Sequence, residues 1–129
     1  VLEGLLKVKT NIDSGAFEAI QRAGIKALEI ADKVASENSR IYSKRRDVLC
    51  RGLEIDPPSA TFYLWAPVPD GYDSFSFTEA LLSKCGILVT PGIGFGEYGE
   101  GFVRFALTES VQRIEEAVER VKKEFIFEQ

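Results

Sequence analysis

The segment from Pro91 to Gly101 places the strongest constraint on the fold, because five of its eleven residues are glycine. Glycine weakens the interior of helices and strands, so a segment this rich in it is expected to be a loop. The residues after it, Phe102–Leu107, are mostly aromatic or aliphatic and predict a β-strand. Thr61–Trp65 has the same character and predicts another strand, so the loop leads into a sheet.

Helices are predicted on the N-terminal side of this sheet. Residues 1–13 read as a short helix end or strand that leads into a turn. Apolar residues then recur with helical spacing from Phe17 to Leu49, with Ser14 as the expected cap. Gly24 is expected to interrupt this region, giving two consecutive helices, and Gly52 is expected to end the second.

Two more helices and a short strand complete the order. Ser76-Phe77-Thr78-Glu79 has capping-box spacing and predicts a helix that ends at Gly86. Residues 87–90 predict a short buried strand. Thr108 or Ser110 is the expected cap of the last helix. The residues expected to be buried by these two helices are Phe77, Leu81, Leu82 and Cys85 in the first, and Val111, Ile114, Val118, Val121 and Phe125 in the second.

The predicted fold class is therefore α/β, an α+β sandwich in which helices pack on one face of a small sheet. With 129 residues the chain has the size of one structural domain. The net charge of −4 provides no positive surface for nucleic acid, and no apolar run reaches the ~20 residues of a membrane-spanning helix.

The two cysteines and the absence of histidine limit the kinds of metal site and nucleophilic catalysis that the chain can support. Cys50 and Cys85 lack the spacing of a zinc site and are expected to be reduced and buried, as in a cytoplasmic protein. No histidine is present, which removes Ser-His and Cys-His nucleophilic catalysis and most zinc sites. We therefore expect no metal site, no nucleic-acid partner and no membrane partner.

Arg104 is the most informative single residue. Side chains alternate along a strand, so Arg104 should share a face with Phe102 and Ala106, opposite Val103 and Phe105. A guanidinium group between apolar walls can bind a carboxylate through two parallel hydrogen bonds. The alternative is an arginine on an edge strand that faces solvent or forms an internal ion pair.

Three segments together resemble class I and II aminotransferases that depend on pyridoxal 5′-phosphate (PLP). They are TPGIGFGEYGEGFVRFALT at 90–108, DPPSATFYLWAPVP at 56–69 and KVKTNIDSG at 7–15. In their order they resemble the C-terminal part of these enzymes, above all the LL-diaminopimelate aminotransferases. The resemblance implies the small domain of a fold type I enzyme, which moves an amino group between an amino acid, such as LL-2,6-diaminopimelate, and a 2-oxo acid.

The resemblance also implies roles for individual residues. Arg104 matches the arginine that binds the substrate α-carboxylate, and Asn11 matches an asparagine that reaches the partner subunit's active site in a homodimer. For Asn11 a plain turn or capping role is the alternative. Phe62 and Tyr63 are able to line the substrate pocket, although packing in the core is favoured for both.

The same resemblance implies a division of the chain and a missing half. Residues 1–13 would end a large-domain segment, 14–50 would form interdomain helices, and 51–129 would form the small domain. No lysine matches the one that binds PLP, and Ser43-Lys44 only imitates the family's Ser-Lys pair. The chain thus contains no catalytic or cofactor-binding residue, and alone it is expected to be an inactive piece of the parent enzyme.

Other interpretations remain at this point. Gly94–Gly99 fits the dinucleotide pattern GxGxxG, but it leads into a strand and carries Glu97, so a phosphate loop is disfavoured. A stand-alone regulatory module of ferredoxin-like type could use Arg104 to bind an effector carboxylate. A decarboxylase, lyase or racemase of the same fold is a third possibility, since fold alone does not set the reaction.

Overall fold

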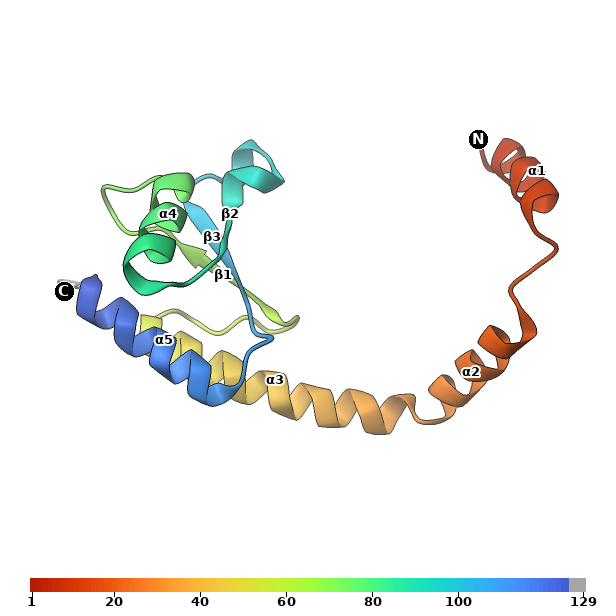
Figure 1. Cartoon of the computed structure of the whole chain (residues 1–129), viewed down its shortest axis with the longest axis horizontal. Helices are drawn as coiled ribbons and strands as arrows, with labels where there is room; N and C mark the ends of the chain where they lie inside the picture. The colour runs from red at the N-terminus through yellow and green to blue at the C-terminus, as the bar shows by residue number, and fades with distance from the viewer. Residues whose placement is uncertain (126–129) are drawn as a thin grey trace. The chain divides into compact units, whose positions relative to one another are not determined.

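The computed structural model describes residues 1–125, and the chain divides into two compact units, Val1–Asn38 and Ser39–Gln129. Within the described residues there are five α-helices and a three-stranded sheet (Figure 1). Helix α3, Ala31–Leu53, contains the boundary between the units, so each unit is described by itself.

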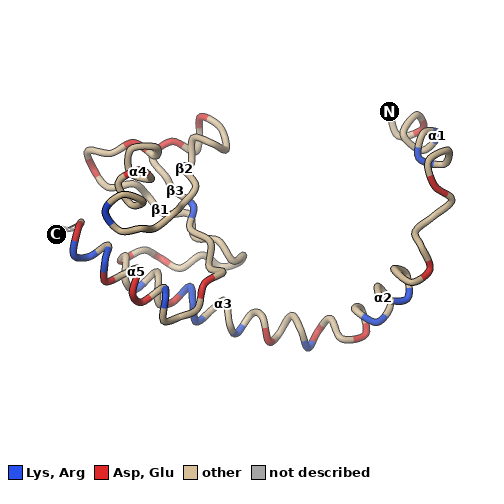
Figure 2. The backbone as a smooth tube through the Cα atoms, viewed as in Figure 1, with Lys and Arg blue, Asp and Glu red and all other residues tan. Residues whose placement is uncertain are grey.

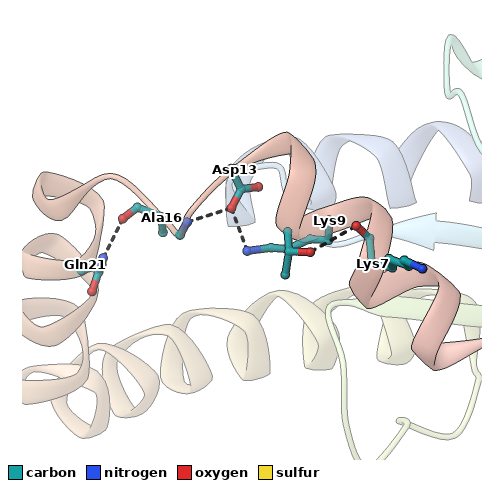
Figure 3. Close-up of polar contacts among 7 residues, drawn as sticks. Lys7, Lys9, Asp13, Ala16 and Gln21 are labelled. Carbon is teal, nitrogen blue, oxygen red and sulfur yellow. Dashed lines mark hydrogen bonds and ion pairs between the residues drawn. The ribbon is translucent and has the colours of Figure 1, made fainter.

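The first unit consists of helices whose side chains are all exposed. Helix α1 spans Leu2–Ile12 and helix α2 spans Glu18–Glu29. After α1, the Asp13 carboxylate accepts hydrogen bonds from Lys9 Nζ at 2.7 Å and from Gly15 N at 3.0 Å (Figure 3). These bonds stabilise the turn in which α1 ends, as the turn-forming residues of this segment predict.

The sheet of the second unit has the antiparallel order β1-β3-β2. Its strands are β1 Tyr63–Pro67, β2 Thr90–Pro91 and β3 Phe102–Ala106. The central strand β3 pairs Leu64 with Phe105 on one side and Thr90 with Arg104 on the other. Backbone bonds from Val68 N to Gly101 O and from Leu107 N to Phe62 O, both 2.8 Å, extend the β1–β3 pairing.

Helices cover one face of this sheet, which confirms the predicted sandwich. Helix α4, Ser74–Cys85, and helix α5, Val111–Glu124, pack there with the last turns of α3. Gly52 allows the close approach of α3 and α5, because a Cβ at that position would overlap the Val118 methyl groups. The best-buried members of the core are Leu64, Leu81, Val103 and Leu107, and Cys50, Cys85, Phe105, Ile114 and Val121 are also buried.

The charged residues of the second unit lie mainly on the helices and not in the strands of the sheet. Basic and acidic residues are interspersed along α3 and α5, whereas the strands are nearly free of charge (Figure 2). Arg104 is the one charged residue in a strand of the part that the structure describes.

Several predicted helix boundaries were wrong. Helix α2 begins after Phe17 and not at Ser14, and the break before α3 falls at Ile30. Gly24 lies inside α2, because a single glycine costs a helix only about 1 kcal/mol. Gly52 lies inside α3, and the residue with positive φ beyond that helix is Glu54.

Helix α4 also begins earlier than predicted. Its cap is Asp73, whose carboxylate accepts from Ser76 N at 2.7 Å, so Ser76 is the third helical residue. Leu82 is half exposed because it is turned by about 100° from Leu81 around the helix, away from the core. Gly86 at the C-terminus and Ser110 at the start of α5 are confirmed as capping residues.

The predicted strand at 87–90 is only Thr90–Pro91, since proline lacks the N–H that would continue the ladder. The predicted loop that follows contains two short 3-10 helices, η1 Gly92–Phe95 and η2 Glu97–Gly99. Gly92 and Gly99 touch through their backbones, and a Cβ on either would overlap a carbonyl oxygen of the other. The two glycines therefore hold the loop in a compact form that other residues could not adopt.

Candidate functional site

Arg104 lies at the centre of the sheet, on the face that the helices leave open. In β3 the buried residues are Val103 and Phe105, whereas Arg104 is only partly buried. Its neighbours across the ladder are Trp65 in β1 and Thr90 in β2. The predicted alternation along this strand is therefore confirmed, and the edge-strand alternative is wrong because β3 is the central strand.

Two aromatic rings flank the Arg104 guanidinium. Its Cζ lies over the Tyr63 ring, 4.2 Å from the centroid, and over the Phe95 ring, 4.6 Å from the centroid. The ring of Trp65 continues the aromatic surface, 5.6 Å from Phe95 and 5.7 Å from Phe102 between centroids. Cation–π contacts of this kind are attractive and leave the N–H groups of the guanidinium available.

No carboxylate of the described residues pairs with those N–H groups. Among residues 1–125, Arg104 forms no ion pair and donates no side-chain hydrogen bond. Other arginines of the same unit are engaged: Arg46 pairs with Asp47 at 2.7 Å, and Arg45 donates to Leu107 O at 3.0 Å. A flanked, partly buried guanidinium with unused donors can bind a carboxylate of a ligand through two hydrogen bonds.

The loop that carries Phe95 is fixed by polar bonds to α4. The Glu100 carboxylate accepts from Ser74 N at 2.7 Å, from Ser74 Oγ at 2.9 Å and from Gly101 N at 2.8 Å. These hydrogen bonds, the one from the Ser74 backbone first, lower the pKa of Glu100. Ile93 N donates to the fully buried Ser74 Oγ at 3.4 Å, so both ends of the loop are attached to one serine.

In enzymes that use PLP, the amine of a lysine holds the cofactor through a Schiff base. All eight lysines, Lys44 on α3 among them, are exposed and lie on helices, and none lies in a strand or in the glycine-rich loop of the second unit. Burial raises the pKa of the Cys50 and Cys85 thiols, which disfavours the nucleophilic thiolate. The strands and the loop around Arg104 therefore supply no lysine for the cofactor and do not fit it.

Asn11 lies in the other unit, near the end of α1. Its Nδ2 donates to Lys7 O at 2.7 Å, and the side chain is exposed. This bond belongs to the helix itself, and it leaves the amide oxygen available. The role of Asn11 toward a substrate stays a prediction.

Residues 1–125 contain neither a membrane-spanning helix nor a metal cluster. No helix there is both long enough and apolar enough to cross a membrane. Within that range, no cluster of three or more histidine, cysteine, aspartate or glutamate side chains has the arrangement of a metal site.

Residues 1–121 match the family model for aminotransferase class I and II, which is nearly the whole chain. This chain belongs to the class I and II aminotransferases. Enzymes of this family use PLP, and the chain corresponds to their C-terminal part. The resemblance of the three motifs is thereby confirmed at the level of the family.

Among the curated relatives of this aminotransferase chain, several are LL-diaminopimelate aminotransferases. The protein from Moorella thermoacetica is 49% identical over 128 residues, and the one from Halothermothrix orenii is 52% identical over 127 residues. Each alignment covers 95% of this chain and 33% of the relative. The chain thus spans about a third of the length of the relatives it matches.

Solved aminotransferases have the same fold as this chain. A probable N-succinyldiaminopimelate aminotransferase from Thermus thermophilus aligns with a TM-score of 0.84 and 34% identity, covering 96% of this chain and 34% of that one. L,L-diaminopimelate aminotransferase from Chlamydomonas reinhardtii aligns with a TM-score of 0.70 and 30% identity, covering 91% and 30%.

Three aromatic residues of this aminotransferase chain were misjudged or missed from the sequence. Core packing was favoured over the substrate pocket for Tyr63 and Phe62, but Tyr63 lies against Arg104, and Phe62 is outside the core with 39% of its surface exposed. Phe95 was not singled out at all, and it supplies the second ring. Its position in a glycine-rich loop just before the Arg104 strand was the available signal.

Proposed function

We propose that the full-length protein containing this chain is an aminotransferase that moves an amino group between LL-2,6-diaminopimelate and a 2-oxo acid. Its place would then be in lysine biosynthesis. The support is the identity of 49% and 52% to two proteins of that name, together with the match to the family model over residues 1–121.

Arg104 is the proposed ligand of the substrate α-carboxylate. The observation that carries this role is a guanidinium in contact with two aromatic rings, on the open face of the sheet, with no carboxylate partner among the described residues. The two oxygens of a carboxylate match two N–H groups of arginine, and such charge-assisted bonds are short and strong. Holding the carboxylate fixes the position of the adjacent α-carbon, which is catalysis by orientation.

The remaining assignments extend this proposal to the whole enzyme. Residues 1–13 would end a large-domain segment, 14–50 would connect the domains, and 51–129 would form the small domain. Asn11 would reach the active site of the partner subunit in a homodimer. The two unpaired, buried cysteines are consistent with a cytoplasmic enzyme.

PLP would supply an electron sink for the α-carbon when it is bound by the rest of the enzyme. Because this chain has no lysine suited to hold it, we propose that the chain alone does not transaminate. No observation among residues 1–125 favours a separate regulatory module, since the family match spans both units.

The test is an assay of the full-length protein with PLP, LL-2,6-diaminopimelate and 2-oxoglutarate. Glutamate formation by the full-length protein and none by the isolated chain is the expected result. A full-length protein that binds PLP but turns over only other amino acids would contradict LL-2,6-diaminopimelate as the proposed substrate. Steady turnover by the isolated chain would overturn its inactivity.

A further inference from the structure

We infer that Tyr63 and Phe95 are positioning residues that hold the Arg104 guanidinium in the orientation that receives the substrate carboxylate. This inference rests on the proposed function of Arg104 and adds two residues that act through it. The donors of a guanidinium lie in its plane, and its two flat faces donate no hydrogen bonds. Two rings in contact with the group therefore restrict its orientation, and they supply no carboxylate that would occupy the donors meant for two oxygens.

The distances support contact of the guanidinium with the faces of both rings. Arg104 Cζ lies 4.2 Å from one ring centroid and 4.6 Å from the other, well within the ~6 Å range of cation–π attraction. An arginine side chain has many rotamers, and ordering it on binding would weaken affinity. Rings that order it beforehand remove that cost, and they also exclude water from the guanidinium faces.

Both rings come from backbone that is itself held in place. Tyr63 lies in β1, where it pairs with Ala106 of the central strand. Phe95 ends η1, whose first residue, Gly92, packs against Gly99. The bonds from Ser74 to Glu100 and from Ile93 to Ser74 then fasten the loop to α4. The two rings that contact the guanidinium thus come from separate elements, β1 and η1.

A purely structural role would have different consequences. Phe95 is 54% exposed, so its ring contributes little to the core, and its truncation should not unfold the protein. If a ring has only a structural role, its removal would lower thermal stability and leave the KM for the substrate unchanged. If the ring positions Arg104, its removal would raise KM only while Arg104 is present.

The experiment compares variants of the full-length enzyme with LL-2,6-diaminopimelate as the varied substrate. Tyr63→Leu and Phe95→Leu should each raise KM by about tenfold and change kcat much less. Tyr63→Phe keeps the ring and should restore the wild-type KM. Tyr98→Leu is the matched control, because Tyr98 is a fully exposed aromatic residue of the same loop. Thermal unfolding of each variant checks the fold, and if Tyr63→Leu does not fold, Phe95→Leu decides.

Repeating the ring changes in an Arg104→Gln background separates the possible outcomes. If the rings act through Arg104, the ring substitutions should cause no further rise in KM in the Arg104→Gln background. An equal rise in both backgrounds would mean that the rings contact the substrate directly, and it would overturn the inference. Unchanged KM in both ring variants, with a raised KM in Arg104→Gln, would overturn the inference and leave the proposed function standing. An unchanged KM in Arg104→Gln would instead overturn the role of Arg104.

Discussion

Glu100 and Ser74 are joined by two hydrogen bonds, from Ser74 N at 2.7 Å and from Ser74 Oγ at 2.9 Å. The first is a bond from the N-terminus of α4 to a carboxylate, where the helix dipole favours a negative charge. Although Glu100 itself is exposed, Ser74 is fully buried, so the pair connects the surface loop to the core. The orientation of the loop thus depends on one acidic residue.

Glu100→Gln is expected to destabilise the chain in a pH-dependent manner. Because these bonds lower the pKa of Glu100 from its ordinary 4.5, its stabilising contribution is complete above that value and is lost as the pH falls through the folded-state pKa. The difference in unfolding free energy between wild type and variant should therefore be constant near neutral pH and shrink in acid. Urea unfolding at a series of pH values measures it.

The matched control for this prediction is Glu97→Gln in the same loop. Within residues 1–125, the Glu97 carboxylate makes no hydrogen bond or ion pair, so its loss should change the unfolding free energy little. A Glu100 variant as stable as the Glu97 variant at neutral pH would contradict the proposed anchoring of the loop.

Leu81 and Leu82 provide a test of the packing of α4. Leu81 is completely buried against the sheet, so Leu81→Ala should lower the unfolding free energy by about 2–5 kcal/mol. Leu82 is 51% exposed, and Leu82→Ala on the same helix should cost under about 1 kcal/mol. Chemical denaturation of the two variants measures both values. Equal losses would mean that α4 is rotated relative to the described packing.

Gly99→Ala tests the close contact inside the glycine loop. The added methyl would overlap the Gly92 carbonyl, so a loss of roughly 1–3 kcal/mol in unfolding free energy is expected. Gly94→Ala is the control, since nothing lies within 4 Å of a Cβ there. Thermal unfolding of both variants compares them, and a harmless Gly99→Ala would show that the loop opens easily.

The local patterns of the sequence were sufficient to predict the fold class and the face of the sheet on which Arg104 lies. The alternation of side chains in Phe102–Leu107 predicted which face Arg104 occupies, and the family motifs predicted its chemistry. Both depend on residues that are neighbours in the chain. For the same reason the caps at Gly86 and Ser110 were predicted correctly.

Some features could not be predicted, because they depend on residues far apart in the sequence or on a choice between two residues that suit the same position. Tyr63 meets Arg104 only through the register of β1 on β3, which no local pattern states. Asp73 and Ser76 both suit a helix cap, and their reciprocal bonds make Asp73 the cap. The apolar pattern of α4 made Leu82 look buried, because a residue next to Leu81 lies at the border of the core-facing stripe.

The most direct test of the account is the KM of the full-length enzyme for LL-2,6-diaminopimelate in wild type and Arg104→Gln. Loss of charge-assisted bonds to the carboxylate should raise KM by about 100-fold, while Arg113→Gln, which removes a surface arginine paired with Glu109, should leave it unchanged. An Arg104→Gln enzyme whose KM equals that of the wild type would contradict the assignment of Arg104 to the substrate carboxylate.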